Sequence, residues 1–336
     1  MTKSLVIGDV HFGCRSNNIV WLEQQLLFFE NQIIPILKSD KIDNVIFLGD
    51  VFDVRYSINQ KVGIDVKNLF RKLCSYNKDI YILAGNHDYY SPLIEFQGYN
   101  AYELIFGKEF LECHNNLHYV TEAPVRIDDS LILPWYFTEE VELWQSVIHD
   151  NKGISTIYCH SDLTSWDDGR LAAIHGVTVY SGHIHYAWKD SSHKLYNIGA
   201  CCAFNFNDVN QKRFVYIIED GKITDAIENI TTPRFKRFYN EDIFNLKDSD
   251  FDNSIVQLCI SQSNINKAKY IEHIKDLKNK YVNSNVKVNI IDDSVIEKLN
   301  TASFDTNIDK YIEQNMPIHL TEKYENVKHK IEENKK

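Results

Sequence analysis

Apolar and polar residues are arranged in blocks along the first 230 residues of the chain. Short apolar runs rich in Val, Ile, Leu and Tyr alternate with longer segments whose apolar residues recur every three or four positions. The short runs predict buried β-strands, and the longer segments predict amphipathic helices. The predicted strands are Ser4–Ile7, Val45–Leu48, Ile80–Leu83, Ile154–Cys159 and Thr178–Tyr180, and the predicted helices are Ile19–Leu37 and Val62–Cys74. Turn signals at Asp128-Asp129 and Asp220-Gly221 add further strands, so we expect a layered α/β core with a more β-rich second half.

A different pattern begins at Thr231-Thr232-Pro233. The polar, acidic segment 245–253 predicts a linker, and a strand, a helix and a second strand follow at Ile255–Ile260, Ile265–Tyr281 and Val286–Ile291. This order predicts a small βαβ module. A short amphipathic helix around Ile308–Ile312 and a highly charged tail complete the chain. We therefore expect three parts, residues 1–232, 233–295 and 296–336.

Five polar motifs follow the predicted strands of the first part. They are Asp9-x-His11, Gly49-Asp50-x-x-Asp53, Gly85-Asn86-His87-Asp88, Cys159-His160 and Gly182-His183-x-His185. In an open α/β sheet, ligands bind beyond the carboxyl ends of the strands, where these motifs lie. Each motif alone is typical of a turn or a helix cap. Their order, each after a strand, indicates one shared site.

The side chains in these motifs predict a metal centre. Carboxylate, carboxamide and imidazole groups are hard or borderline ligands that suit Mn, Fe, Mg or Zn. Residues i and i+2 of a strand point to the same side, so Asp9 pairs with His11, and His183 with His185. His160 is the ligand with the shortest motif, and His149 and His175 compete with it. The strand leading directly into His160 favours that residue.

The composition of the chain indicates in which kind of protein and in which compartment this site occurs. The net charge of -11 does not favour coating of nucleic acid by the overall field, so any DNA affinity must come from local basic patches, metal ions or a partner. Seven cysteines without a CxxC pair argue against a disulfide scaffold and a thiolate zinc site. The N-terminus lacks a signal pattern, and no apolar stretch has the length of a membrane helix. We therefore expect a soluble, intracellular protein without membrane contact, acting in the cytoplasm.

The ordered motifs resemble those of the calcineurin-like metallophosphoesterase superfamily over roughly residues 4–230. The resemblance implies a β-sandwich flanked by helices, with two divalent metal ions. It also implies which residues bind them: Asp9, His11, Asp50 and His185 for one metal, and Asp50, Asn86, His160 and His183 for the other. His87 would then stand beside the scissile phosphate, oriented by Asp53. Such a metal pair polarises phosphoryl oxygens and lowers the pKa of a bound water.

Further segments resemble the SbcD-type nucleases, including the recombination endonuclease subunit of T-even phages. The matching segments are GDVFDVRYSINQK (49–61), GNHDYY, Leu133-Pro134-Trp135 and SGHIH. The resemblance implies DNA as substrate, a capping role for the βαβ module and docking of the late helix on an SbcC-type ATPase. It also implies a homodimer through Val62–Cys74 and Ala101–Phe106. Cys159 and the Ala200-Cys201-Cys202 segment depart from the family pattern without removing a ligand.

Several assignments remain open at the level of sequence. Mn²⁺ is the preferred metal, with Mg²⁺, Fe²⁺ or Zn²⁺ as alternatives. Four basic residues flank the motifs as candidate phosphate contacts, and ordinary solvated surface is the competing interpretation: Arg15, Arg55, Lys61 and Arg170. The rival functions are a stand-alone phosphatase or cyclic-nucleotide phosphodiesterase, and a scaffold without catalysis.

Overall fold

Two six-stranded sheets form the core of the larger part of the chain. The computed structural model describes residues 2–39, 41–53, 55–137, 141–163, 176–281 and 286–294. The first sheet has the order β12-β11-β1-β2-β3-β4, and the second has the order β5-β6-β7-β8-β10-β9. The bounds in the first sheet are β1 (Lys3–Ile7), β2 (Asn44–Phe47), β3 (Asp79–Leu83), β4 (Leu117–Val120), β11 (Phe214–Glu219) and β12 (Lys222–Glu228). Those in the second are β5 (Val125–Ile127), β6 (Ser130–Leu133), β7 (Thr156–His160), β8 (Thr178–Gly182), β9 (Trp188–Asp190) and β10 (Leu195–Asn197).

The five predicted strands are therefore confirmed, with ends displaced by one or two residues. Both turn signals also lie where a chain reversal occurs. Asp128-Asp129 joins β5 to β6, and Asp220-Gly221 joins β11 to β12, each as an antiparallel pair.

Alternation along each strand produces the layers of the sandwich. In β1, Leu5 and Ile7 belong to the cluster that packs against helices, whereas Val6 belongs to the cluster between the two sheets. In β7, Ile157 faces outward and Tyr158 faces the inner layer. Because side chains point to opposite faces in turn, an all-apolar strand is buried on both sides. The continuous apolar runs in the sequence follow from this four-layer arrangement.

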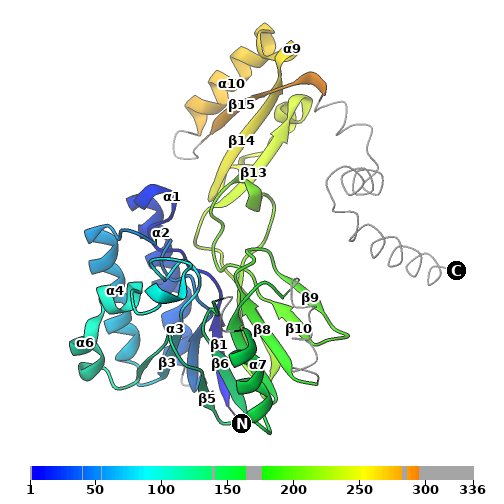
Figure 1. The fold of residues 1–336 in the computed structure, drawn as a ribbon. Helices are drawn as coiled ribbons and strands as arrows, with labels where there is room; N and C mark the ends of the chain where they lie inside the picture. The colour runs from blue at the N-terminus through cyan, green and yellow to red at the C-terminus, as the bar shows by residue number, and fades with distance from the viewer. Residues whose placement is uncertain are drawn as a thin grey trace, which may run out of the picture. The chain divides into compact units, whose positions relative to one another are not determined.

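Helices cover the outer faces of both sheets. Those of the first sheet are α2 (Ile19–Phe28), α3 (Ile34–Lys38), α4 (Gln60–Cys74), α5 (Ala101–Ile105) and α6 (Gly107–Cys113). Figure 1 shows α2, α4 and α6 gathered on one side of β1 and β3, and α7 (Val141–Asp150) beside the second sheet. The predicted helix Ile19–Leu37 contains a π-helical turn at Phe29–Ile33, next to Pro35, which lacks a backbone N–H. None of the helices in the described ranges combines the length and apolar composition needed to cross a bilayer.

The C-terminal region contains the predicted strand–helix–strand order and one further strand. A third sheet has the order β13-β14-β15, formed by β13 (Arg234–Tyr239), β14 (Ser254–Ser261) and β15 (Lys287–Ile291). β14 and β15 are parallel, and the helix between them is split into α9 (Gln262–Ile265) and α10 (Ala268–Lys280). The expected linker 245–253 contains a 3₁₀ turn at Asp248–Asp250.

The chain divides into two compact units by its own contacts. Among the described residues, one unit contains those up to 237 together with 249–255, and the other contains 238–248 together with those from 256 to 294. The chain therefore passes between the units three times, within β13, within the 3₁₀ turn Asp248–Asp250 and within β14. The expected domain limits at 232 and 295 stay predictions. The expected helix around Ile308–Ile312 and the segment 296–336 lie outside the described residues.

Candidate metal centre

The five polar motifs meet at one edge of the sandwich. β1, β2 and β3 are mutually parallel, as are β7 and β8, so the carboxyl ends within each set lie on the same side. Asp9, Asp50 and Asn86 follow β1, β2 and β3 by two or three residues. His160 is the last residue of β7, and His183 comes directly after β8. The topology thus brings to one place side chains that are as far apart in the sequence as Asp9 and His183, which are separated by 174 positions.

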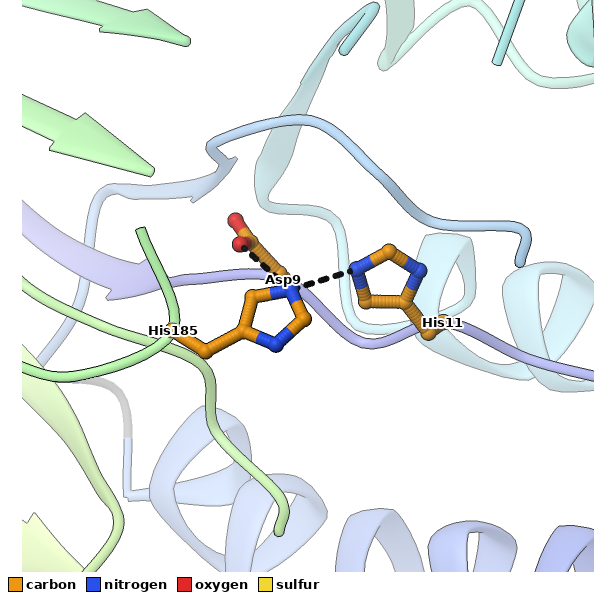
Figure 2. Close-up of side chains that lie close together, drawn as sticks. All are labelled: Asp9, His11 and His185. Atoms are coloured by element: carbon orange, nitrogen blue, oxygen red, sulfur yellow. Dashed lines mark hydrogen bonds and ion pairs between the residues drawn. The ribbon is translucent and has the colours of Figure 1, made fainter. Parts of the chain in front are cut away.

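Asp9, His11 and His185 form the first cluster (Figure 2). His11 Nε2 lies 3.1 Å from His185 Nε2, and His185 Nε2 lies 3.8 Å from Asp9 Oδ2. Asp9 and His11 are almost fully buried. Figure 2 shows Asp9 and His11 on the segment after β1 and His185 on a second segment, with the two rings and the carboxylate converging.

Asp50, Asn86, His160 and His183 form the second cluster. Asn86 Oδ1 lies 3.0 Å from His160 Nε2 and 2.9 Å from His183 Nδ1. Asp50 Oδ2 lies 3.3 Å from His160 Nε2. A backbone contact fixes the His160 ring, because Nδ1 lies 2.6 Å from the carbonyl oxygen of Leu48 and donates to it. This leaves Nε2 as the nitrogen that faces Asp50 and Asn86.

Asp50 stands between the two clusters. Its Oδ2 is 3.6 Å from His11 Nε2 in the first cluster and 3.3 Å from His160 Nε2 in the second. Its Oδ1 accepts a hydrogen bond of 2.8 Å from the backbone N–H of His87. One carboxylate therefore faces both groups of donors, the position that a bridging ligand requires.

The donor set fits a pair of divalent cations. Every donor in the two clusters is an oxygen or an imidazole nitrogen, the ligand types of Mn²⁺, Fe²⁺, Mg²⁺ and Zn²⁺ centres without thiolates. Asp9 Oδ2 is buried and accepts no hydrogen bond from the residues that the structure describes. A buried carboxylate oxygen without a donor is costly unless a cation neutralises it. The clusters therefore suit metal ions better than a purely structural role.

Charges in the cluster shift the pKa values of its members. Burial lowers the pKa of His160, but the carboxylates of Asp50 and Asp9 outweigh it and raise this pKa to about 9. Burial raises the pKa of Asp50, but the surrounding imidazoles hold it well below its usual range. Burial also holds the pKa values of His183 and His185 below their ordinary value. Without a cation, the centre therefore binds a proton at His160, which a metal must displace.

Glycines allow the strand ends to approach this closely. A Cβ at Gly85 would overlap Asp50 Oδ1, and a Cβ at Gly182 would overlap Asp9 Oδ1. The close approach expected of glycines in these motifs is thus present at both positions.

His87 and Asp53 are arranged differently from the expectation. His87 Nδ1 lies 2.6 Å from the backbone carbonyl oxygen of Asp53, so the main chain of Asp53, and not its carboxylate, orients the ring. The Asp53 carboxylate instead lies 3.3 Å from His11 Nδ1. Burial lowers the pKa of His11, but Asp53, Asp50 and Asp9 outweigh it and raise this pKa. The Asp53 carboxylate is close to both rings, since the donor atoms of His11, Asp53 and His87 all lie within 4.8 Å of one another.

Two buried polar residues without a predicted role, Asp88 and Gln25, support the site. Asp88 accepts hydrogen bonds from the backbone N–H groups of Phe52 (3.1 Å) and Gly85 (2.9 Å) and from the Tyr102 hydroxyl (2.8 Å). Burial and the neighbouring Asp50 raise the pKa of Asp88 to about 7. Asp88 thereby ties together the loops that carry Asp50 and Asn86. In the sequence, the signal for this role of Asp88 was its position at the end of the Gly85-Asn86-His87-Asp88 motif.

Gln25 is the second supporting residue. It is fully buried on α2, and its Nε2 donates to the carbonyl oxygens of Val10 (2.6 Å) and His11 (3.4 Å). A polar residue on the apolar face of the predicted helix Ile19–Leu37 was the signal for it.

The four candidate phosphate contacts have different surroundings. The Arg15 guanidinium lies over the rings of Trp21 (5.0 Å) and Phe235 (5.3 Å). Arg55 is half-buried in a cleft of about 400 Å³ with several tyrosines. Lys61 is exposed, and its Nζ pairs with Asp65 Oδ2 on the same helix at 2.8 Å. Arg170 lies outside the described residues, as does His175; His149 is exposed and pairs with Asp150, so it does not replace His160.

Comparisons with known proteins agree with this geometry. The calcineurin-like phosphoesterase family model matches residues 2–187. Exonuclease subunit 1 of Enterobacteria phage T4 is 24% identical over 329 residues, which cover 92% of each chain. The DNA double-strand break repair protein Mre11 of Saccharolobus solfataricus is 23% identical over 204 residues, 56% of this chain and 51% of that protein. Mre11 of Sulfurisphaera tokodaii is 30% identical over 87 residues, 26% of this chain and 22% of that protein.

Proposed function

Because the chain belongs to the calcineurin-like phosphoesterase family, we propose that it is a two-metal DNA nuclease that hydrolyses phosphodiester bonds. The observation that carries the proposal is the pair of donor clusters that share Asp50. The names of the three relatives, an exonuclease subunit and two DNA break repair proteins, favour DNA as the substrate.

We assign seven residues as metal ligands. Asp9, His11, Asp50 and His185 would hold one cation, and Asp50, Asn86, His160 and His183 the other. Bound cations would neutralise the phosphate, polarise it and acidify a water. Mn²⁺ is the proposed metal, since mixed oxygen and imidazole donors suit it.

His87 is the proposed catalytic residue. Its Nδ1–H donates to the Asp53 carbonyl oxygen, which fixes the ring and leaves Nε2 to carry the exchangeable proton. An imidazole held in this way stabilises negative charge on phosphoryl oxygens or gives its proton to the leaving oxygen. Asp53 acts here as a positioning residue through its main chain and through its contact with His11.

The decisive experiment compares the wild type with His87→Ala on linear duplex and single-stranded DNA with added Mn²⁺. We expect the variant to bind the metal with wild-type stoichiometry and to lose at least 100-fold in cleavage rate, the typical contribution of general acid–base catalysis. Full turnover by metal-loaded His87→Ala would remove His87 from the mechanism. The same assay, sampled over time, distinguishes exonuclease from endonuclease products.

The first rival function is a stand-alone phosphatase or cyclic-nucleotide phosphodiesterase, which the donor clusters and the net charge of -11 also fit. Turnover of a phosphomonoester or a cyclic nucleotide without any DNA cleavage would establish it. A protein that binds no stoichiometric divalent metal would instead be a scaffold without catalysis.

We further propose two protein partners. An SbcC-type ATPase subunit would supply DNA affinity that the acidic chain lacks, and the word "subunit" in the name of the phage relative supports this assignment. A second copy of the chain would dock through the surface of α4 and α5, where large apolar side chains are exposed. We also propose that the protein acts in the cytoplasm.

A further inference from the structure

The inner layer of the sandwich opens into a cleft away from the metal ligands. The cleft has a volume of about 900 Å³ and is lined by residues of β8, β9 and β10 from the second sheet and by β11 and the β11–β12 turn from the first. Figure 1 shows β8, β9 and β10 at one edge of the second sheet. All these residues belong to the same compact unit.

Tyrosine rings lead from the buried core to this cleft. Tyr158 and Tyr180 stack with centroids 5.8 Å apart, and Tyr180 and Tyr196 stack at 5.1 Å. Tyr158 and Tyr180 are buried, whereas Tyr196 is half-buried and lines the cleft. Tyr216, on the facing sheet, is also half-buried and lines it. The cleft therefore presents aromatic rings that pack against the buried inner layer.

The charge of the lining is opposite to that of the whole chain. Lys189, Lys194 and Lys222 line the cleft and are exposed, while Asp220 is the single acidic residue among its described lining residues. Lys194 Nζ donates to the carbonyl oxygen of Gly176 at 3.0 Å. Within the described ranges, none of the three lysines pairs with a carboxylate. On a protein of net charge -11, this is a local basic site.

We propose that this cleft binds single-stranded nucleic acid, with bases stacked on Tyr196 and Tyr216 and phosphates near Lys189, Lys194 and Lys222. Proteins that bind single-stranded nucleic acid commonly combine aromatic side chains, on which bases stack, with a positively charged groove that follows the backbone. Unstacked bases require a single strand, because the rings of a duplex already stack on one another. The volume lies in the range of about 300–1,000 Å³ typical of small-ligand sites, which suits a few nucleotides rather than a duplex.

One wall of the cleft is connected to the metal centre. Asn197 lines the cleft, and its Nδ2 donates at 2.7 Å to the carbonyl oxygens of both Ile184 and Tyr186. These two residues flank His185, a proposed metal ligand. A nucleic-acid strand bound in the cleft would therefore lie close to Asn197, which positions the loop of His185. The inference extends the proposed nuclease function, but binding itself requires neither metal nor hydrolysis.

The test measures binding of a fluorescent oligothymidylate by anisotropy, with metal removed by EDTA. Lys189→Glu combined with Lys222→Glu should weaken binding at least tenfold and lower the log–log salt slope by about 1.4, since each lost phosphate contact on a single strand contributes about 0.7. The matched control, Lys38→Glu with Lys108→Glu, makes the same charge change at exposed lysines elsewhere and should change affinity less than twofold.

A second pair of variants tests stacking. Tyr196→Leu keeps apolar volume but removes the ring, so we expect at least fivefold weaker binding, whereas Tyr196→Phe should retain wild-type affinity. Equal melting temperatures of the variants and the wild type would show that each folds. Unchanged affinity in both Lys189→Glu/Lys222→Glu and Tyr196→Leu would overturn the proposal, as would an equal loss in the control pair. Because EDTA prevents hydrolysis, failure of the nuclease assay does not affect this result.

Discussion

Three of the proposed ligands have backbone conformations that residues other than glycine rarely adopt. His11, Asp50 and His183 have φ values of 51°, 48° and 80°, in the left-handed region. Each such residue costs on the order of 1–2 kcal/mol, which the surrounding structure must offset. Gln25 does so at His11, by donating to the carbonyl oxygen of that residue and of Val10. Backbone strain is therefore present at three positions where donors must point inward.

The pKa of His160 predicts how metal affinity depends on pH. A metal binds neutral imidazole, and the pKa of about 9 keeps this ring protonated at pH 7 in the metal-free protein. The apparent affinity of the second cluster should therefore rise about tenfold per pH unit from pH 7 to pH 9 and level off above pH 9. Calorimetry in two buffers of different ionisation enthalpy would count the released proton.

His160→Gln provides the control for this prediction. The variant keeps an oxygen donor but has no titrating ring, so proton release should fall by about one per metal at pH 7. An affinity that is constant between pH 7 and pH 9 in the wild type would contradict the protonation of His160.

At the scale of elements, the loops after β2 and β3 are fastened to α5. Tyr102 on α5 is fully buried, and its hydroxyl lies 2.8 Å from Asp88 Oδ2 and 2.9 Å from the Leu83 carbonyl oxygen. Tyr102→Phe should lower the free energy of unfolding by about 1 kcal/mol, since it leaves buried acceptors without this donor. It should also weaken metal binding, because Asp88 connects the loops of Asp50 and Asn86. Urea unfolding and metal titration measure the two effects.

Tyr119→Phe is the matched control. The Tyr119 ring lies 5.7 Å from that of Tyr102, but its buried hydroxyl has no hydrogen-bond partner among the described residues. Removing an unpartnered hydroxyl should leave stability unchanged or raise it, with no loss of metal affinity. Equal effects of the two substitutions would argue against the connection through α5.

Strand runs and glycine-flanked polar motifs made much of this arrangement predictable. Continuous apolar runs indicated strands buried on both faces, and parallel pairing then placed the motifs at one edge. The direction of a loop side chain is not encoded by such periodicity, so the sequence does not indicate which atoms of Asp53 contact His87 and which contact His11: the carbonyl oxygen contacts His87, and the carboxylate contacts His11. β13 was missed because its sequence, RFKRFY, mixes basic and aromatic residues directly after Pro233 and lacks an apolar run.

At the scale of the whole molecule, the net charge of the chain and the local charge of the proposed DNA-binding sites have opposite signs. A net charge of -11 repels DNA, whereas the metal centre and the lysine-lined cleft would attract it locally. An acidic surface with small cationic sites limits non-specific binding and leaves affinity to several weak contacts. A second copy of the chain would raise the overall affinity for DNA, because the second copy would bind at a high effective concentration once the first is bound.

We expect the chain to form a dimer through α4, α5 and the adjoining loops. Tyr56, Tyr99 and Leu104 are 70%, 67% and 71% exposed and line one cleft, and Ile64 on α4 is 62% exposed. Exposed tyrosines of this kind are typical anchors of protein interfaces. Sedimentation velocity at micromolar concentration should therefore give about twice the chain mass of 39.3 kDa.

Tyr99→Glu with Leu104→Glu should yield monomers, because two charges cannot be buried there without partners. Leu143→Glu, at a 57% exposed position on α7, should remain a dimer. A monomeric wild type, or a dimer that survives Tyr99→Glu with Leu104→Glu, would rule out this surface as the interface.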